Sequence, residues 1–392
     1  KGDNYLYIYS HQITTVFIFQ IILSLFGRAT FILYIMQSFS ISFIIFMLYK
    51  IANILFEDED TNYIVVILGA LCFPLIFYVA FVYGLLPGMF LTLVAYYYFI
   101  KYTKEKHWYQ LVISALSINL AILLIGNNLI HLLAIFAVAV IYFIRNKDWK
   151  VIAFILSCVF LMSASKSVIT NYYEVKSQKE IAEGVPKITW IAMGMQEGER
   201  EAGWWNRFNY DIMPEEEHDT KRITEISKTS MKQRLNVFRD NPKYALDFYQ
   251  RKYENQFIEP TFQSLLVTAP QRNFSNETTL EKIRDFFVKQ IYFNHTHTVL
   301  EFIMKVFQVF VYLFTFVFTV VMYKRKNEFF AIIPIAFIGG TLFNMIWEAK
   351  SRYIFPYFVF LIPLSAYGLV IVRNKIKEYK KLKEEKDEKS TI

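Results

Sequence analysis

The sequence predicts an all-α polytopic membrane protein that carries one water-soluble insert, and three observations support this class. Apolar and aromatic residues dominate from Thr30 to Lys166 and again from Val299 to Val372. A bilayer hydrocarbon core of about 30 Å needs about 20 largely apolar helical residues per crossing, and these stretches are long enough for several. The segment between them carries charges every few residues, too many for lipid. Hydrophobic residues make up 55% of the chain and charged residues 19%, which is unusual for a soluble protein.

Nine apolar segments are predicted to be transmembrane helices. They are residues 31–55, 62–83, 88–102, 109–126, 129–145, 150–167, 299–323, 329–347 and 353–373. The chain then divides into the end of a first external loop with an interfacial helix (1–30), six transmembrane helices (31–167), a soluble insert (168–298), three transmembrane helices (299–373) and a basic tail (374–392).

Positive charge in the short loops predicts the orientation in the cell membrane. Lys and Arg cluster at residues 101–106, 145–150 and 324–326, and again in the tail from Arg373. Short loops rich in Lys and Arg stay in the cytoplasm, so all four clusters are predicted to be cytoplasmic. Nine crossings satisfy this arrangement, and the insert then lies outside the cell.

The apolar segment Ile13–Phe26 does not fit among the crossings, because both of its ends must be external. It is also short for a crossing, and we expect a helix lying in the outer membrane interface. The alternative is that this segment crosses the bilayer and a later one does not.

The insert is predicted to be largely helical, because Glu225–Arg239 and Pro242–Tyr253 alternate apolar and charged residues at helical spacing. The stretch Gly184–Tyr210 differs, since glycines interrupt it and it contains Trp204 and Trp205. Such a loop is typical of a site where a sugar ring stacks on indole faces. A loop that docks the insert onto the membrane helices has the same composition, and both interpretations stay open.

Composition and motifs exclude several functions. The net charge of +8 lies in short loops and the tail, which argues against nucleic-acid binding. Phosphate-binding glycine loops, dinucleotide-binding motifs and nucleophile elbows are absent from the sequence. Cys72 and Cys158 lie in apolar runs and are interpreted as small core residues. His295 and His297, with the distant His218, lack the spacing of a metal site, so no metal ligand is predicted, and a divalent-cation requirement is left open.

A tight external turn, Trp347–Tyr353, offers the best candidate for chemistry. Its cations Lys350 and Arg352 are suited to bind a lipid phosphate, Arg352 through its planar fork and Lys350 as a point charge. Glu348 would hold them in place or accept a hydrogen bond from substrate. The alternative is an ordinary loop whose long cations reach the interface.

Other polar residues are predicted to face the same side of the membrane. Tyr9, His11 and Gln12 precede the interfacial helix, where they would meet a lipid headgroup. Asn128 lies in a second external turn, and Glu259 begins a Glu-Pro-Thr element within the insert.

Four of these elements, in this order, resemble a known family. They are Tyr9–Gln12 with Phe26-Gly27, Trp190–Gly194 with Gly203–Asn206, Glu259–Thr261 and Trp347–Tyr353. The sequence resembles the multi-spanning glycosyltransferases of the GT-C fold related to the protein mannosyltransferase-like family 39, above all a Gram-positive branch. It departs from that pattern at Ser10, where the family has proline, and at Trp205, where it has tyrosine.

The resemblance implies transfer of a sugar from a polyprenyl-phosphate donor to a cell-wall glycan or glycolipid acceptor at the outer membrane face. It implies phosphate binding by Lys350, Arg352 and His11. The other candidate site residues would line the substrates; they are Tyr9, Gln12, Asn128, Trp204, Trp205, Glu259 and Glu348. The family's catalytic base is an aspartate in the first external loop, expected upstream of Lys1, so these residues alone are expected to be inactive.

Two other classes remain as alternatives: a polysaccharide polymerase or ligase, and a non-enzymatic flippase or transporter of lipid-linked sugars. Transporters usually place ionisable residues midway along their crossings. Here almost all charges lie at the ends of the predicted helices, with Lys305 the nearest exception. This pattern favours chemistry on a lipid headgroup at the membrane surface.

Overall fold

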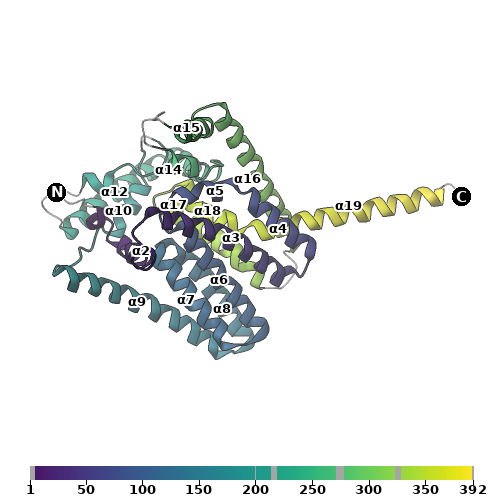
Figure 1. Ribbon diagram of the computed structural model, residues 1–392, viewed down its shortest axis with the longest axis horizontal. Coiled ribbons are helices and arrows are strands. Elements are labelled where there is room, and N and C mark those ends of the chain that lie inside the picture. Colours follow the sequence, from purple (N-terminus) through teal and green to yellow (C-terminus); the bar gives the residue numbers. More distant parts are fainter. Residues whose placement is uncertain (1–4, 199, 213–218, 271–277, 323–327, 391–392) are drawn as a thin grey trace.

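The protein is all-helical in the computed structural model, which describes residues 5–198, 200–212, 219–270, 278–322 and 328–390 (Figure 1). Helices account for 85% of the structure, and the described residues contain no strand. The predicted all-α class is therefore confirmed.

The helices form three groups along the chain. The first group comprises α1 (Tyr5–Ile8), η1 (Ser10–Gln12), α2 (Ile13–Phe26), α3 (Thr30–Phe56), α4 (Glu59–Leu71), α5 (Phe73–Phe77), η2 (Tyr78–Ala80), α6 (Leu85–Glu105), α7 (Trp108–Leu124), η3 (Gly126–Asn128), α8 (Leu129–Asn146) and α9 (Trp149–Ser177). The insert contains α10 (Lys187–Gly194), α11 (Phe208–Asp211), α12 (Thr220–Asp240), α13 (Pro242–Phe257), α14 (Ser264–Thr268) and α15 (Thr279–Tyr292). The third group comprises α16 (His295–Met322), η4 (Glu328–Ala331), α17 (Ile332–Ile346), α18 (Ser351–Phe360) and α19 (Ile362–Ser390).

The apolar helices pack into one bundle with a continuous core. Helix α6 packs along α7 and α3, and α16 packs along α19. The α6 side chains Tyr96, Phe99 and Tyr102 are fully buried in this core. Large apolar side chains also remain on the outside of the bundle, among them Phe160 and Phe316. An apolar exterior of this kind is expected of a protein whose surroundings are lipid.

Each predicted crossing coincides with a helix or a pair of helices, although not all of them meet the length and composition expected of a span. Five helices are long and apolar enough to cross a membrane, and two bent pairs bring the number to seven within the described residues. Helix α7 is apolar but shorter, and α6 carries charges in its last turns. The described residues thus contain several helices that are long and apolar enough to span a membrane, and the number of nine crossings stays a prediction.

The two bent pairs break beside prolines. Helices α4 and α5 meet at Cys72, two residues before Pro74, and α18 and α19 meet at Leu361, two residues before Pro363. Each pair is bent by 51°. Proline lacks the N–H that would continue the helical ladder and its ring crowds the preceding turn, so a sharp bend is expected at both positions.

The insert and the C-terminal helix occupy opposite ends of the molecule (Figure 1). The insert covers the end where α9 finishes and α16 begins, whereas α19 extends from the other end. Among the described residues, three ion pairs join the basic clusters to acidic residues that are distant in the sequence. These are Lys104 with Glu57 at 2.8 Å, Lys106 with Asp148 at 3.5 Å, and Arg373 with Asp60.

Helix α2 lies beside α7 and α9. The hydroxyl of Thr14 donates to the carbonyl oxygen of Leu123 at 2.6 Å, and that of Thr15 to the carbonyl oxygen of Leu124 at 2.8 Å. These bonds satisfy carbonyls at the C-terminal end of α7, which has no further intrahelical donors for them. They also fix the position of Tyr9–Gln12, which immediately precede α2.

Candidate functional site

The candidate site is built around the turn between α17 and α18, which meets the insert through two glycines. The amide of Ala349 donates to the carbonyl oxygen of Gly203 at 2.9 Å. Gly203 has φ +69, a conformation that side chains disfavour, and Gly194 ends α10 directly against the backbone of Trp347. A Cβ on Gly194 would lie 2.5 Å from the Trp347 carbonyl oxygen. Only glycines permit so close an approach of two backbones.

A buried lysine stabilises this contact between the insert and the turn. The fully buried Lys252 of α13 donates from Nζ to three backbone carbonyl oxygens. The distances are 2.5 Å to Gly194, 2.7 Å to Trp347 and 3.0 Å to Met345. Burial lowers the pKa of Lys252 to about 7, and the nearby Glu348 carboxylate opposes this shift. Three acceptors match the three N–H groups of an ammonium ion, so the lysine joins α10, α13 and the end of α17.

Glu348 and Lys350 form a buried ion pair on the same turn. Nζ of Lys350 lies 2.6 Å from Oε1 of Glu348, with the two side chains 14% and 3% exposed. The pKa of Lys350 is lowered by burial, which Glu348 partly offsets. The ammonium group also lies 5.9 Å from the ring centre of Trp205 and 5.8 Å from that of Tyr353. Lys350 is therefore a desolvated cation with one carboxylate and two aromatic neighbours.

Arg352 lies among aromatic rings. Its guanidinium carbon is 5.1 Å from the ring centre of Phe81, 5.7 Å from Tyr353 and 5.9 Å from Tyr83. Within the described part of the chain it makes no ion pair with a carboxylate. The guanidinium shares a hydrogen bond with Tyr353, and its other donors remain available for an anion at the end of the bundle that the insert covers.

The N-terminal segment reaches the same place through two bridging residues. Nε2 of Gln12 donates to the hydroxyl of Tyr83, the residue that flanks Arg352. Nδ2 of Asn209 donates to the Tyr9 hydroxyl at 3.1 Å, while its Oδ1 accepts from Nε1 of Trp205 at 3.1 Å. Burial raises the pKa of Tyr9. Segments that are far apart in the sequence therefore surround Arg352 and Lys350.

His11 lies at the rim of this site. Its Nε2 is 3.4 Å from Nε2 of Gln12, and its ring centre is 6.1 Å from that of Tyr9. The side chain is exposed, unlike those of Glu348 and Lys350. Its position is compatible with contact to a bound headgroup from the solvent side.

Glu259 anchors the insert to the turn. Its Oε2 accepts from the Ser351 hydroxyl and from the Gln263 amide, both at 2.7 Å. Its Oε1 accepts from the amide of Thr261 at 3.0 Å and from the hydroxyl of the same residue. This carboxylate therefore holds Ser351, which lies between Lys350 and Arg352, in a fixed position.

The remaining two predicted residues have different surroundings. Asn128 is buried, and its Nδ2 donates to the Ala121 carbonyl oxygen at 2.7 Å, which stabilises the turn between α7 and α8. Trp204 lines a groove of about 500 Å³ beside α16, whereas its neighbour Trp205 faces Lys350. The structure thus brings Tyr9, His11, Gln12 and Trp205 to the turn.

Three residues of the site had no distinctive signal in the sequence. Lys252 has the spacing of an ordinary charged residue on an amphipathic helix, and its burial follows only from docking against α17. Tyr83 precedes Gly84, and Asn209 lies within the glycine-interrupted stretch Gly184–Tyr210, but neither residue has an individual pattern that marks it.

A metal centre finds no support in the described residues, since no three His, Cys, Asp or Glu side chains converge there. His297 is hydrogen-bonded to the Ile291 carbonyl oxygen at 3.0 Å and lies 3.3 Å from Glu301. His218 lies outside the described residues. Cys72 and Cys158 are unpaired and buried, as predicted for small core residues.

The fold and this polar junction define a helical integral membrane protein. Residues 5–369 match the family described as "Conserved hypothetical integral membrane protein", and the chain belongs to that family. Comparisons with curated proteins and with solved structures gave no match.

Proposed function

We propose that this protein is a membrane glycosyltransferase that moves a sugar from a polyprenyl-phosphate donor to a cell-envelope acceptor. One observation carries the proposal: Lys350 and Arg352 meet Gln12, Tyr9 and Trp205 at a single desolvated site. Cations surrounded by aromatic rings suit a phosphate with an attached sugar, because the rings offer stacking faces beside the charge. The resemblance of the same four sequence elements to GT-C glycosyltransferases supports this choice.

The proposed reaction assigns a task to each group. The acceptor oxygen forms a bond to the anomeric carbon while the bond from that carbon to the phosphate oxygen breaks, and the hydroxyl proton passes to a base. Arg352 and Lys350 stabilise the charge that develops on the departing phosphate, and Glu348 orients Lys350. Glu348 and Glu259 do not suit the role of base, since each is already hydrogen-bonded. This agrees with the resemblance, which assigns that role to an aspartate of the first external loop.

The proposed topology has nine crossings, with the insert outside the cell and the C-terminus in the cytoplasm. Nucleotide sugars are cytosolic, so an external site requires a donor already flipped across the bilayer. The separation of the insert from the basic loops supports this arrangement, because Lys and Arg in short loops favour the cytoplasmic side.

Binding of the donor phosphate tests the proposal. In the full-length protein, Arg352→Ala should weaken binding of radiolabelled polyprenyl phosphate by about 10- to 100-fold, the value of a hydrogen bond to a charged group. Transfer from the corresponding lipid-phosphate sugar should fall at least as much at limiting donor. The control is Lys381→Ala, which removes an exposed cation of α19 and should change neither quantity. Equal affinities for the two variants would exclude Arg352 as the phosphate ligand.

Accessibility of single cysteines tests the orientation. Gln233 is exposed on α12, and Cys72 and Cys158 are buried, so the native thiols should stay unreactive. We expect Gln233→Cys to react with a membrane-impermeant maleimide on intact cells, and Lys381→Cys to react only after permeabilisation. The reverse pattern would place the insert in the cytoplasm and rule out an external donor.

A further inference from the structure

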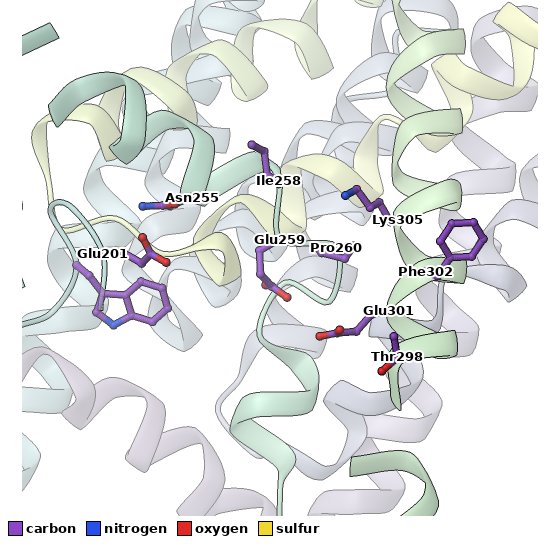
Figure 2. A pocket seen from close by; sticks show the side chains of 10 residues that line it. Glu201, Asn255, Ile258, Glu259, Pro260, Thr298, Glu301, Phe302 and Lys305 are labelled. Atoms are coloured by element: carbon purple, nitrogen blue, oxygen red, sulfur yellow. The ribbon is translucent and has the colours of Figure 1, made fainter. Parts of the chain in front are cut away.

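A second polar hollow lies beside the candidate site. Figure 2 shows Glu259 and Pro260 on the loop between α13 and α14, with Glu301 and Lys305 extending from α16 towards them. Trp204 and Asn255 contribute to the same groove, whose volume is about 500 Å³. This volume falls in the range of small-molecule binding sites.

The groove and the cationic turn share a wall. Glu259 lines the groove, while its Oε2 accepts from Ser351, between Lys350 and Arg352. The two adjacent tryptophans also contribute to both places: Trp204 lines the groove, and the ring centre of Trp205 lies 5.9 Å from Nζ of Lys350. Two ligands, one in the groove and one at the cationic turn, would therefore be separated only by these shared residues.

The charges of the two hollows are opposite. Among its lining residues the groove has three carboxylates, Glu201, Glu301 and the engaged Glu259, against one cation, Lys305. Glu301 lies 3.3 Å from His297, and Arg200 lies 6.0 Å from the ring centre of Trp204. Carboxylates repel a phosphate and accept hydrogen bonds from hydroxyl groups, so the groove selects a ligand rich in hydroxyls. An indole face within it suits the apolar face of a sugar ring. Nδ2 of Asn255 is buried without a hydrogen-bond partner among the described residues, and a ligand oxygen would satisfy it.

An apolar helix face adjoins the groove, with Phe302 among the residues that line it. Beyond Glu301, α16 presents Phe302, Val306 and Val309, which are 67%, 55% and 57% exposed. Lipid is the surrounding expected for such a face in a transmembrane helix. A ligand with a sugar headgroup in the groove could therefore extend an acyl or prenyl chain along α16.

We propose that this groove binds the uncharged sugar headgroup of a lipid-anchored acceptor. Trp204 stacks on the sugar ring, and Glu201 and Glu301 accept hydrogen bonds from its hydroxyls. Lys305 lies at the end of the groove nearest the lipid-facing part of α16. The term acceptor rests on the proposed glycosyltransferase function, whereas sugar binding in the groove does not.

Two photoreactive probes of equal chain length test this assignment on the full chain in phosphatidylcholine nanodiscs. One is an alkyl glucoside and the other is an alkyl phosphate. We expect the glucoside to label α16 and the loop that contains Trp204. Trp204→Ala and Glu301→Gln should each reduce this labelling by about tenfold, the value of one stacking or hydrogen-bond interaction. Both should leave labelling by the phosphate unchanged.

Controls separate the groove from the donor site. Trp204→Phe keeps an aromatic face and should retain most of the glucoside labelling, and Trp149→Ala, which removes an exposed tryptophan at the start of α9, should have no effect. Arg352→Ala should reduce labelling by the phosphate only. If the phosphate is insensitive to Arg352 while the glucoside depends on Trp204, the proposed function fails and the groove remains a sugar site. Glucoside labelling that is unchanged in Trp204→Ala and Glu301→Gln would overturn the inference.

Discussion

Replacing Gly194 by alanine should destabilise the protein by about 3 kcal/mol, the upper part of the usual range for overpacking. The new Cβ would lie 2.5 Å from the carbonyl carbon and oxygen of Trp347 and 2.8 Å from the amide nitrogen of Glu348. These are backbone atoms, so the clash cannot be relieved by rotating a side chain. Moving them would stretch the Lys252 bonds to Trp347 and Met345 and displace Glu348 and Lys350.

The matched control is Gly126→Ala. An added Cβ at Gly126 meets nothing within 4 Å. We expect the apparent Tm of purified Gly194→Ala to fall by several degrees in the same detergent, and that of Gly126→Ala to stay close to the wild-type value. If both variants have the same apparent Tm as the wild type, the insert does not dock tightly on the turn.

Replacing Lys252 by methionine should have a comparable or larger effect on stability. Methionine fills a similar volume but donates no hydrogen bond, so the carbonyl oxygens of Gly194, Met345 and Trp347 would lose their shared donor. Each buried acceptor left unsatisfied costs about 1–3 kcal/mol. Glu348, which favours the charged form of Lys252, would also lose a neighbouring cation. We therefore expect the insert to separate from the turn.

Limited proteolysis together with the apparent Tm would report this change. Lys252→Met should expose the insert to protease and lower the apparent Tm, whereas Lys243→Met, on the exposed first turn of the same helix, should do neither. Protection equal to that of the wild type would mean that the glycine contacts hold the turn without the lysine.

The helices were predictable because crossing a bilayer requires long apolar runs, and such runs are a property of composition. The sequence also contains the reasons for both bends, Pro74 and Pro363, but proline alone does not show whether a bent pair counts as one span. Length and composition are least decisive for α6 and α7, since α6 has charges in its last turns and α7 is short. The number of crossings therefore cannot be derived from composition.

The candidate site was predictable in part, for a physical reason. Polar and aromatic residues at the ends of apolar helices must lie near the membrane surface, so the sequence predicts that Tyr9, Gln12, Lys350 and Arg352 share one side of the membrane. The sequence does not show which polar side chains make structural hydrogen bonds and which remain available to bind a ligand. Asn128 bonds a carbonyl of α7 and Glu259 bonds Ser351, and neither contact has a local pattern.

The projecting helix α19 has a practical consequence for studying the protein. Beyond Arg373, which is paired with Asp60, its last turns extend for roughly 25 Å at 1.5 Å per residue. A fluorescent label on an exposed residue of these turns, such as Lys383, would thus be carried on a natural spacer, clear of the remaining helices. A label beside Tyr9 and Gln12 would instead disturb the candidate site.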